Sequence, residues 1–183
     1  GTITAEAGRI GIAGVIVRNS GLLNASSVVN EGGRIFLKAT KSVVLDGASI
    51  IRADAGDTGS GGNVLVWSDE TAAVDGVISA RGGRLSGGGG FVETSGKAHL
   101  TVNGLRVDTG GGQWLLDPSN FTIGVDITGA ALGGNLASND VTILSNDGGS
   151  GSDGDIFVND AVAWASAHTL TLSAYRNIEI NSP

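Results

Sequence analysis

Apolar and polar residues alternate with a period of two in short runs along the chain. Runs rich in Val, Ile, Leu and Thr place apolar side chains two positions apart: Ile35 and Leu37, Val64 and Val66, Ile156 and Val158, Leu170 and Leu172, Ile178 and Ile180. Such alternation over short runs, interrupted by Asp-Gly, Asn-Gly or Gly-rich turns, indicates β-strands. Helical spacing is weak throughout, and residues 126–137 are the one candidate helix. An all-β fold is therefore expected.

A short motif, Gly followed by any residue and an apolar residue, recurs along the chain. It opens segments at Gly33-Arg34-Ile35, Gly62-Asn63-Val64, Gly90-Phe91-Val92, Gly112-Gln113-Trp114 and Gly154-Asp155-Ile156. In three segments a second Gly, namely Gly47, Gly76 or Gly104, follows 14 residues after the first. The segments begin 29 and then 28 residues apart, and Gly-rich stretches at 55–62 and 81–90 hold the surplus length. These two stretches are expected to be loop insertions in a repeating unit.

Repeated units with several short strands each predict a solenoid, in which every coil hydrogen-bonds to the next. We expect a right-handed parallel β-helix of about eight coils. Residues 1–183 would form one segment, with more regular coils over 1–117 and longer loops over 118–183. A β-sandwich is the alternative, because turn signals at short intervals suit it too. The constant 14-residue offset favours the solenoid, since a sandwich has no reason to repeat it.

The β-helix makes two predictions about equivalent positions. Each opening Gly is followed two residues later by an apolar residue, so one inward ladder should contain Ile35, Val64, Val92 and Trp114. The glycines of the second signature should occupy equivalent corners with positive φ, a conformation that Gly adopts without steric cost; these are Gly47, Gly76 and Gly104.

Composition and charge exclude several classes of protein. The 183 residues include 32 Gly, 2 Pro and 0 Cys, which removes disulfide scaffolds, thiol catalysis and Cys-based zinc sites, and Gly has no collagen period. The net charge of −7 and the absence of a basic cluster argue against nucleic acid as a partner. Mean hydropathy is +0.18 and no apolar run approaches membrane-spanning length, so no membrane insertion is expected.

Several segments resemble the shaft repeats of filamentous-haemagglutinin-like exoproteins, the large adhesins that Gram-negative bacteria export by two-partner secretion. The similar segments are 61–69 (GGNVLVWSD), 77–83 (VISARGG), 89–97 (GGFVETSGK), 114–118 (WLLDP), 154–159 (GDIFVN) and 170–174 (LTLSA). The resemblance implies a β-helical shaft outside the cell or on the bacterial outer surface. Nothing here is similar to the family's N-terminal secretion domain.

The function expected on these grounds is that of a non-enzymatic shaft segment of a secreted, cell-surface or matrix-associated adhesin, without a cofactor. Its partners would be neighbouring coils of the same long protein, and surface polysaccharide, matrix polysaccharide or a host receptor are further candidates. Neither end of the chain reads as a cap, so we expect the coils to continue at both ends and the isolated segment to stack end to end. Two alternatives are a polysaccharide-binding face in a biofilm matrix and a β-helical carbohydrate-active enzyme.

Catalytic residues are hard to assign. His99 and His168 stand in no nucleophile or metal-ligand motif, and His99 alternates with apolar neighbours as an outward strand residue would. The enzyme alternative would need paired carboxylates, for which stacked coils offer Glu93, Asp108 and Asp117. Most other Asp residues stand beside Gly in turns. No catalytic residue is therefore assigned.

Two further binding candidates remain. Residues 148–153 match the first six positions of a calcium-binding nonapeptide, and with the nearby acids they make Asp147, Asp153 and Asp155 calcium candidates; an ordinary turn is the alternative. Trp67 is out of phase with Val64 and Val66, so its indole is either packed at a coil edge or available to stack on a sugar ring.

Asn24 and Asn120 each begin an Asn-x-Ser/Thr acceptor pattern for glycosylation. The pattern is only three residues long and often arises by chance.

Overall fold

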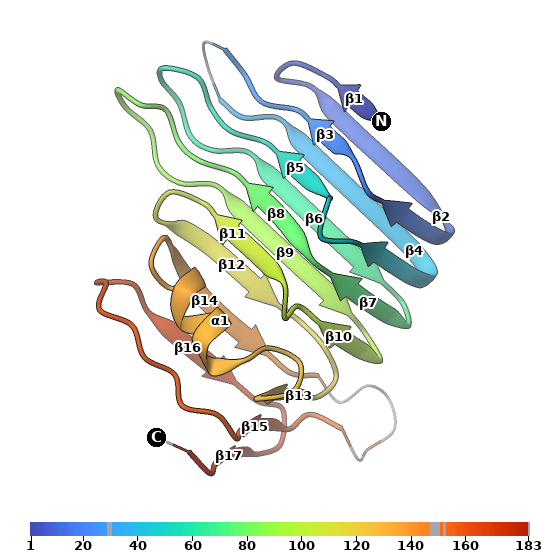
Figure 1. Ribbon diagram of the computed structural model, residues 1–183, viewed down its shortest axis with the longest axis vertical. Coiled ribbons are helices and arrows are strands. Elements are labelled where there is room, and N and C mark those ends of the chain that lie inside the picture. Colours follow the sequence, from blue (N-terminus) through green and yellow to red (C-terminus); the bar gives the residue numbers. More distant parts are fainter. Residues whose placement is uncertain (29–30, 147–150, 152, 183) are drawn as a thin grey trace.

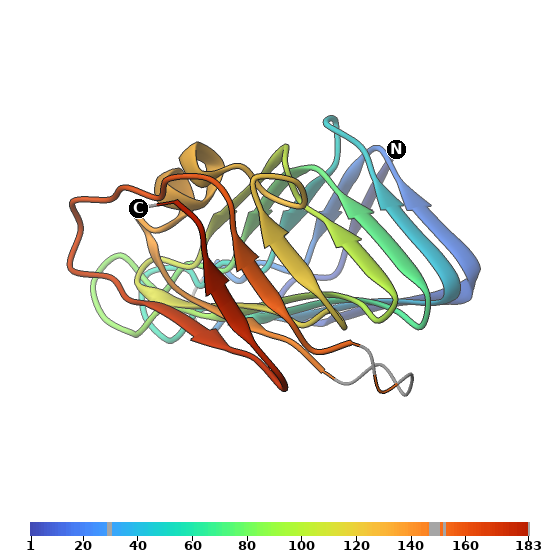
Figure 2. The ribbon, with the colours of Figure 1, turned by 90° about the horizontal axis from the view of Figure 1, so that it is seen from below.

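The computed structural model describes residues 1–183 except 29–30, 147–150, 152 and 183. The fold is an all-β parallel solenoid of about six turns (Figure 1), which confirms the expected fold class. Strands of successive turns lie side by side in sequence order (Figure 2), and every pairing between named strands is parallel. The surfaces of the solenoid are therefore built from rows of residues contributed one per turn.

Three sheets form the walls. The first sheet contains β1 (Thr2–Thr4), β3 (Leu22–Asn24), β5 (Ile50–Arg52), β8 (Gly76–Ser79) and β11 (Leu105–Asp108). The second contains β2 (Arg9–Asn19), β4 (Arg34–Leu45), β6 (Asn63–Ser68), β9 (Phe91–Gly96), β12 (Gly112–Leu116), β14 (Asn139–Leu144) and β16 (Leu170–Ser173). In the same sheet β7 (Thr71–Val74) pairs with the later part of β4, and β10 (His99–Thr101) pairs with β7. The third contains β13 (Phe121–Ile123), β15 (Ile156–Val158) and β17 (Ile178–Ile180).

The core consists of inward ladders of aliphatic side chains. In the second sheet, Ile35 pairs with Val64, Val64 with Val92, and Val92 with Trp114. All four side chains are fully buried, so the predicted ladder is confirmed. Each added turn extends such ladders by one apolar residue, and the apolar area removed from water stabilises the stack.

The coil count of eight was too high. The motif at Gly154 and the similar position at Asn177 precede β15 and β17, and both strands extend the third sheet from β13. The turns that contain β15 and β17 already have their second-sheet strands, β14 and β16. The same motif begins strands in two different sheets, which explains the overcount.

The prediction for the three corner glycines was only partly right. Gly76 has φ +87°, whereas Gly47 and Gly104 are absent from the positive-φ residues of the described chain. The three positions are not equivalent in the stack, because Gly76 pairs with Leu105 and the residue after it, Val77, pairs with Ile50. Gly47 instead belongs to a turn that is longer than the corner at Gly76.

The Gly-rich stretches 55–62 and 81–90 are loops between strands, as expected. They stack on each other through a bridge between Thr58 and Ser86 and through a hydrogen bond from Leu85 N–H to Asp57 O of 2.8 Å. An ion pair between Arg84 and Asp57 joins the same loops. The insertions therefore continue the coil-on-coil stacking outside the core.

Helix α1 (Gly129–Asn135) lies inside the segment flagged for weak helical spacing. It comes after β13 in the chain and lies beside β11, the last strand of the first sheet. Two asparagine side chains near its C-terminal end bond to the free edge of β11. Asn135 accepts from Val107 N–H at 2.7 Å and donates to Leu105 O at 3.1 Å. Asn139 accepts from Thr109 N–H at 2.7 Å and donates to Val107 O at 2.9 Å. The side-chain amides thus replace the next strand and end the first sheet.

Gly76→Ala is expected to lower the free energy of unfolding by at least ~1–2 kcal/mol through left-handed strain. A Cβ at this position would also stand 2.3 Å from Ser49 O. Gly47→Ala is the matched control, because a Cβ there meets nothing within 4 Å, and its effect should stay within about 0.5 kcal/mol. Denaturant unfolding of both variants measures this, and equal losses would contradict the corner assignment.

Asn139→Leu is expected to destabilise the chain by about 2 kcal/mol or more, because Thr109 N–H would be buried without its acceptor and Val107 O would keep only the 3.4 Å bond from Ser138. Asn63→Leu, an exposed Asn on β6, is the control and should have little effect. Urea unfolding compares the two variants. An Asn139→Leu variant as stable as the parent chain would show that these amides do not support the edge of the first sheet.

Candidate functional site

The outer face of the second sheet brings together basic, acidic, aromatic and amide side chains. Three rows of residues in the outward phase of the strands, one residue per turn, make up this face; Ser95 shares that phase but is buried. The first row is Arg9, Arg34, Asn63, Phe91, Gln113 and Asp140; the second is Gly11, Phe36, Leu65, Glu93, Leu115 and Thr142; the third is Ala13, Lys38, Trp67 and Ser95. We refer to these rows together as the outer face.

Trp67 lies in the third row between Lys38 and Ser95. Its side chain is half-buried, and its indole N–H donates to Asp69 at 2.9 Å. Trp114, by contrast, is fully buried and donates to Thr94 at 3.0 Å, and Trp164 is 41% exposed. The sugar-stacking candidate therefore lies on the outer face, partly open to solvent, with one edge fixed by a carboxylate.

Two of the three candidate carboxylates come together on this side of the solenoid. Glu93 lies on β9, and Asp117 follows directly after β12, the next strand of the sheet. Burial raises the pKa of Glu93 above its ordinary value, and the nearby charge of Asp117 adds to the rise against the hydrogen bond from Ser95. Burial also raises the pKa of Asp117, which Asn146 partly offsets by hydrogen bonding. The two acids hold protons more readily than exposed acids do.

Asp108 does not join them. It ends β11 in the first sheet, and its carboxylate lies 3.7 Å from the Arg81 guanidinium. The coil stacking thus separates it from the Glu93 and Asp117 pair, and the predicted grouping of three was wrong for Asp108.

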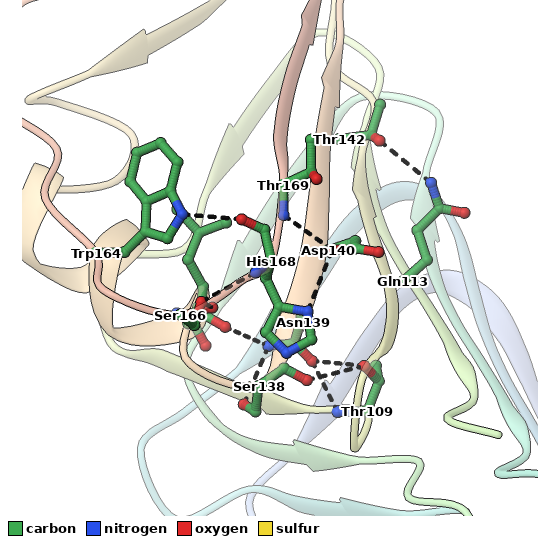
Figure 3. Close-up of polar contacts among 12 residues, drawn as sticks. Thr109, Gln113, Ser138, Asn139, Asp140, Thr142, Trp164, Ser166, His168 and Thr169 are labelled. Carbon is green, nitrogen blue, oxygen red and sulfur yellow. Dashed lines mark hydrogen bonds and ion pairs between the residues drawn. The ribbon is translucent and has the colours of Figure 1, made fainter. Parts of the chain in front are cut away.

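A polar network lies at one edge of the outer face (Figure 3). His168 Nδ1 is 3.2 Å from Asp140 Oδ1, which also accepts from Thr169 N–H at 2.9 Å. The backbone hydrogen bond is the largest cause that lowers the pKa of Asp140. Gln113 donates to Thr142 at 3.2 Å across the neighbouring turn. These bonds join residues that are 28 to 29 apart in sequence, so they tie one coil to the next.

His99 is exposed on β10, as expected for an outward strand residue. Its Nε2 is 3.8 Å from Asp126 Oδ1, a buried atom that has no hydrogen-bond partner among the described residues. Burial raises the pKa of Asp126, whereas the hydrogen bond from Thr122 N–H and the charge of His99 oppose the rise. Sequence spacing gave no sign of this pairing.

The calcium candidates have protein partners. Asp153 accepts from Asn120 Nδ2 at 2.6 Å, and Asp155 accepts from Asn177 and lies 3.2 Å from the Arg176 guanidinium. Asp147 lies outside the described residues. Within the described part of the chain, no three His, Cys, Asp or Glu side chains gather as a metal ion would require.

The two glycosylation patterns differ in their surroundings. The Asn24 side-chain oxygen accepts from Ser26 N–H at 3.1 Å, and its amide nitrogen bonds to none of the described residues. Both polar atoms of the Asn120 amide are hydrogen-bonded: its Nδ2 donates to Asp153, and its Oδ1 accepts from Gly154 N–H at 2.9 Å. A sugar on Asn120 would have to break the contact with Asp153.

Sequence reasoning missed the pairing of Arg9 with Arg34. The signal was present, because Gly8-Arg9-Ile10 and Gly33-Arg34-Ile35 repeat the same three residues at the start of two successive second-sheet strands. In the structure the two arginines are direct neighbours across β2 and β4.

Comparisons with known proteins add no assignment. The chain matches no protein-family model, no curated protein and no solved structure at a significant level. Over the described residues, no helix has the length and apolar character needed to cross a membrane. Arguments about function therefore start from the fold and from the outer face.

Glu93→Gln is expected to stabilise the chain at pH 7 and to lose that advantage as the pH falls. The pKa of Glu93 is raised above 4.5, so the folded chain binds more protons than the unfolded chain just above this pH, and stability falls as pH rises through the raised value. Gln at position 93 cannot ionise, so the variant avoids this loss of stability, and its amide oxygen can still accept the hydrogen bond from Ser95. Urea unfolding at acidic and neutral pH measures the difference.

Asp140→Asn is the control of opposite sign. Because the pKa of Asp140 is lowered below 3.8, its ionised form stabilises the fold above that pH, and this contribution is lost as the pH falls. Asp140→Asn should therefore be less stable than the parent chain at pH 7, with a deficit that shrinks in acid. Parallel pH dependence in both variants would contradict the assigned environments.

Proposed function

We propose that this chain is a shaft segment of a secreted bacterial adhesin, held on the cell surface or in the surrounding matrix, and that it has no enzymatic role. One observation carries the proposal: the second sheet runs through every turn as a continuous parallel ladder, from β2 to β16. Because each turn contacts chiefly its neighbours, adding turns lengthens the stack without changing its cross-section. The resemblance of its segments to adhesin shaft repeats supports the same role.

The neighbouring coils of a longer rod are the first partners that we propose. Among the described residues, β1 pairs only with β3, and β17 pairs only with β15. Ile178 and Ile180 on β17 are 44% and 69% exposed. Unpaired strand edges and exposed apolar side chains favour the addition of a further strand, from the same protein or from a second copy.

Polysaccharide binding is the second candidate function, and the aromatic residues of the outer face favour it. Phe36, Trp67 and Phe91 come from the neighbouring strands β4, β6 and β9, and all three are half-buried. Aromatic rings that keep one part in solvent can stack on sugar rings. The shaft would then carry its own contact surface for glycans.

Antibodies against the 183-residue chain test the shaft proposal in cells that produce the natural protein. A surface or matrix shaft should be labelled on intact cells or recovered in the culture medium, and external protease should remove the label. An antibody against a cytoplasmic protein is the control for cell lysis. Labelling only after permeabilisation would contradict the proposal.

A further inference from the structure

The charge of the chain is distributed unevenly along the solenoid axis. Residues 1–52 hold six basic and three acidic residues, whereas residues 53–183 hold five basic and 15 acidic residues. The turns are stacked in sequence order (Figure 1), so this difference in charge gives the solenoid a basic end and an acidic end. The net charge of −7 conceals the basic end.

Three of the basic residues belong to the outer face. Arg9 and Arg34 stand directly opposite each other on β2 and β4, about 4.8 Å apart at the backbone, and Lys38 follows on β4. All three side chains are exposed, and none forms an ion pair with a described residue. Like charges placed opposite each other on adjacent strands repel. An anion bound between them would relieve this repulsion.

The arginine pair borders a depression of about 790 Å³. Its lining includes Arg9, Arg34, Glu31 and the glycines at the corner between the first and second sheets. The glycines keep the floor of the depression low, because the backbone there carries no side chains. Glu31 supplies an acceptor for hydroxyl groups in the same depression, while the guanidinium groups supply donors for carboxylate or sulfate oxygens.

Aromatic residues continue the surface from the arginine pair. The Arg9 guanidinium lies 5.4 Å from the centre of the Phe36 ring, and Lys38 pairs with Trp67 on the next strand. Cations, hydroxyl acceptors and rings therefore follow one another across three strands. This combination matches a sugar chain that carries negative charges, since its rings stack and its acidic groups pair with arginine.

We propose that the basic end of the outer face binds an anionic polysaccharide. Its carboxylate or sulfate groups pair with Arg9 and Arg34, its hydroxyl groups bond to Glu31, and a neighbouring sugar ring stacks on Phe36 or Trp67. This inference rests on the second candidate function, polysaccharide binding, and is independent of the shaft role. Nucleic acid fits less well, because its affinity comes mainly from many phosphate contacts and this face offers three basic residues, whereas a polysaccharide also uses the aromatic rings and Glu31.

The test measures binding of the 183-residue chain to immobilised polygalacturonate, which carries carboxylates, and to dextran sulfate, which carries sulfates. The double variant Arg9→Gln/Arg34→Gln should weaken binding by about tenfold or more. Raising NaCl from about 50 to about 300 mM should weaken binding of the parent chain, because salt screens exposed charges. The polymer with the stronger arginine-dependent binding identifies the acidic group.

The matched control is Arg52→Gln/Arg106→Gln, which makes the same charge change at exposed positions of the first sheet. It should retain binding within about twofold, and thermal unfolding must show that both double variants are folded. Equal losses in both double variants, or no binding of either polymer, would overturn the inference. Equally tight binding of single-stranded DNA would overturn it as well. Binding of uncharged dextran that survives Arg9→Gln/Arg34→Gln would overturn the anionic assignment but leave polysaccharide binding standing.

Discussion

The close, in-register approach of successive turns is the constraint on which the rest of the structure depends. It is severe at the corner that leads into the second sheet, where a Cβ on Gly62 would stand 2.0 Å from Gly33 O. Glycine allows backbone to pass over backbone there, and Gly62 N–H donates to Ala53 O at 2.7 Å. Once this corner is set, the following strand has a fixed register, and Val64 must lie over Ile35.

The same register determines the surface as well as the core. Alternation places every second residue outside, so each outward row repeats one position of the turn. This is why Arg9 meets Arg34 and why Lys38 meets Trp67, although each pair is separated by a full turn of sequence. Insertions are tolerated where the Gly-rich loops leave the first sheet, since there they stack on each other without disturbing the ladder. The rod can therefore vary its surface while its core stays the same.

Local sequence patterns predicted the features of the fold that depend on residues close together in the chain. The alternation of apolar and polar residues predicted the strands. The Gly-x-apolar motif predicted the inward ladder that includes Trp114, and weak helical spacing indicated the segment that contains α1. The patterns were ambiguous where one motif serves two sheets, as at Gly154, which led to the excess coils. A glycine at the same offset in two repeats also does not occupy the same corner, because the turn that contains Gly47 is longer than the turn at Gly76.

The outer face was harder to predict because it depends on which turn lies beside which. Trp67 was identified from its phase alone, but its neighbours Lys38 and Ser95 follow from the pairing of β6 with β4 and β9. Asp140 and His168 meet only because β14 and β16 are adjacent. The replacement of a strand by the amides of Asn135 and Asn139 also has no local signature, since the edge that they bond belongs to the preceding turn.

Removal of one complete turn tests the stacked, in-register architecture most directly. Deleting residues 62–89 joins Gly61 to Gly90, and the pairing of Val64 with Val92 means that β9 can take the place of β6 beside β4. The shortened chain should remain folded, unfold cooperatively, and show in solution scattering a rod shorter by about 4.8 Å. A chain that no longer folds after this deletion would contradict the account.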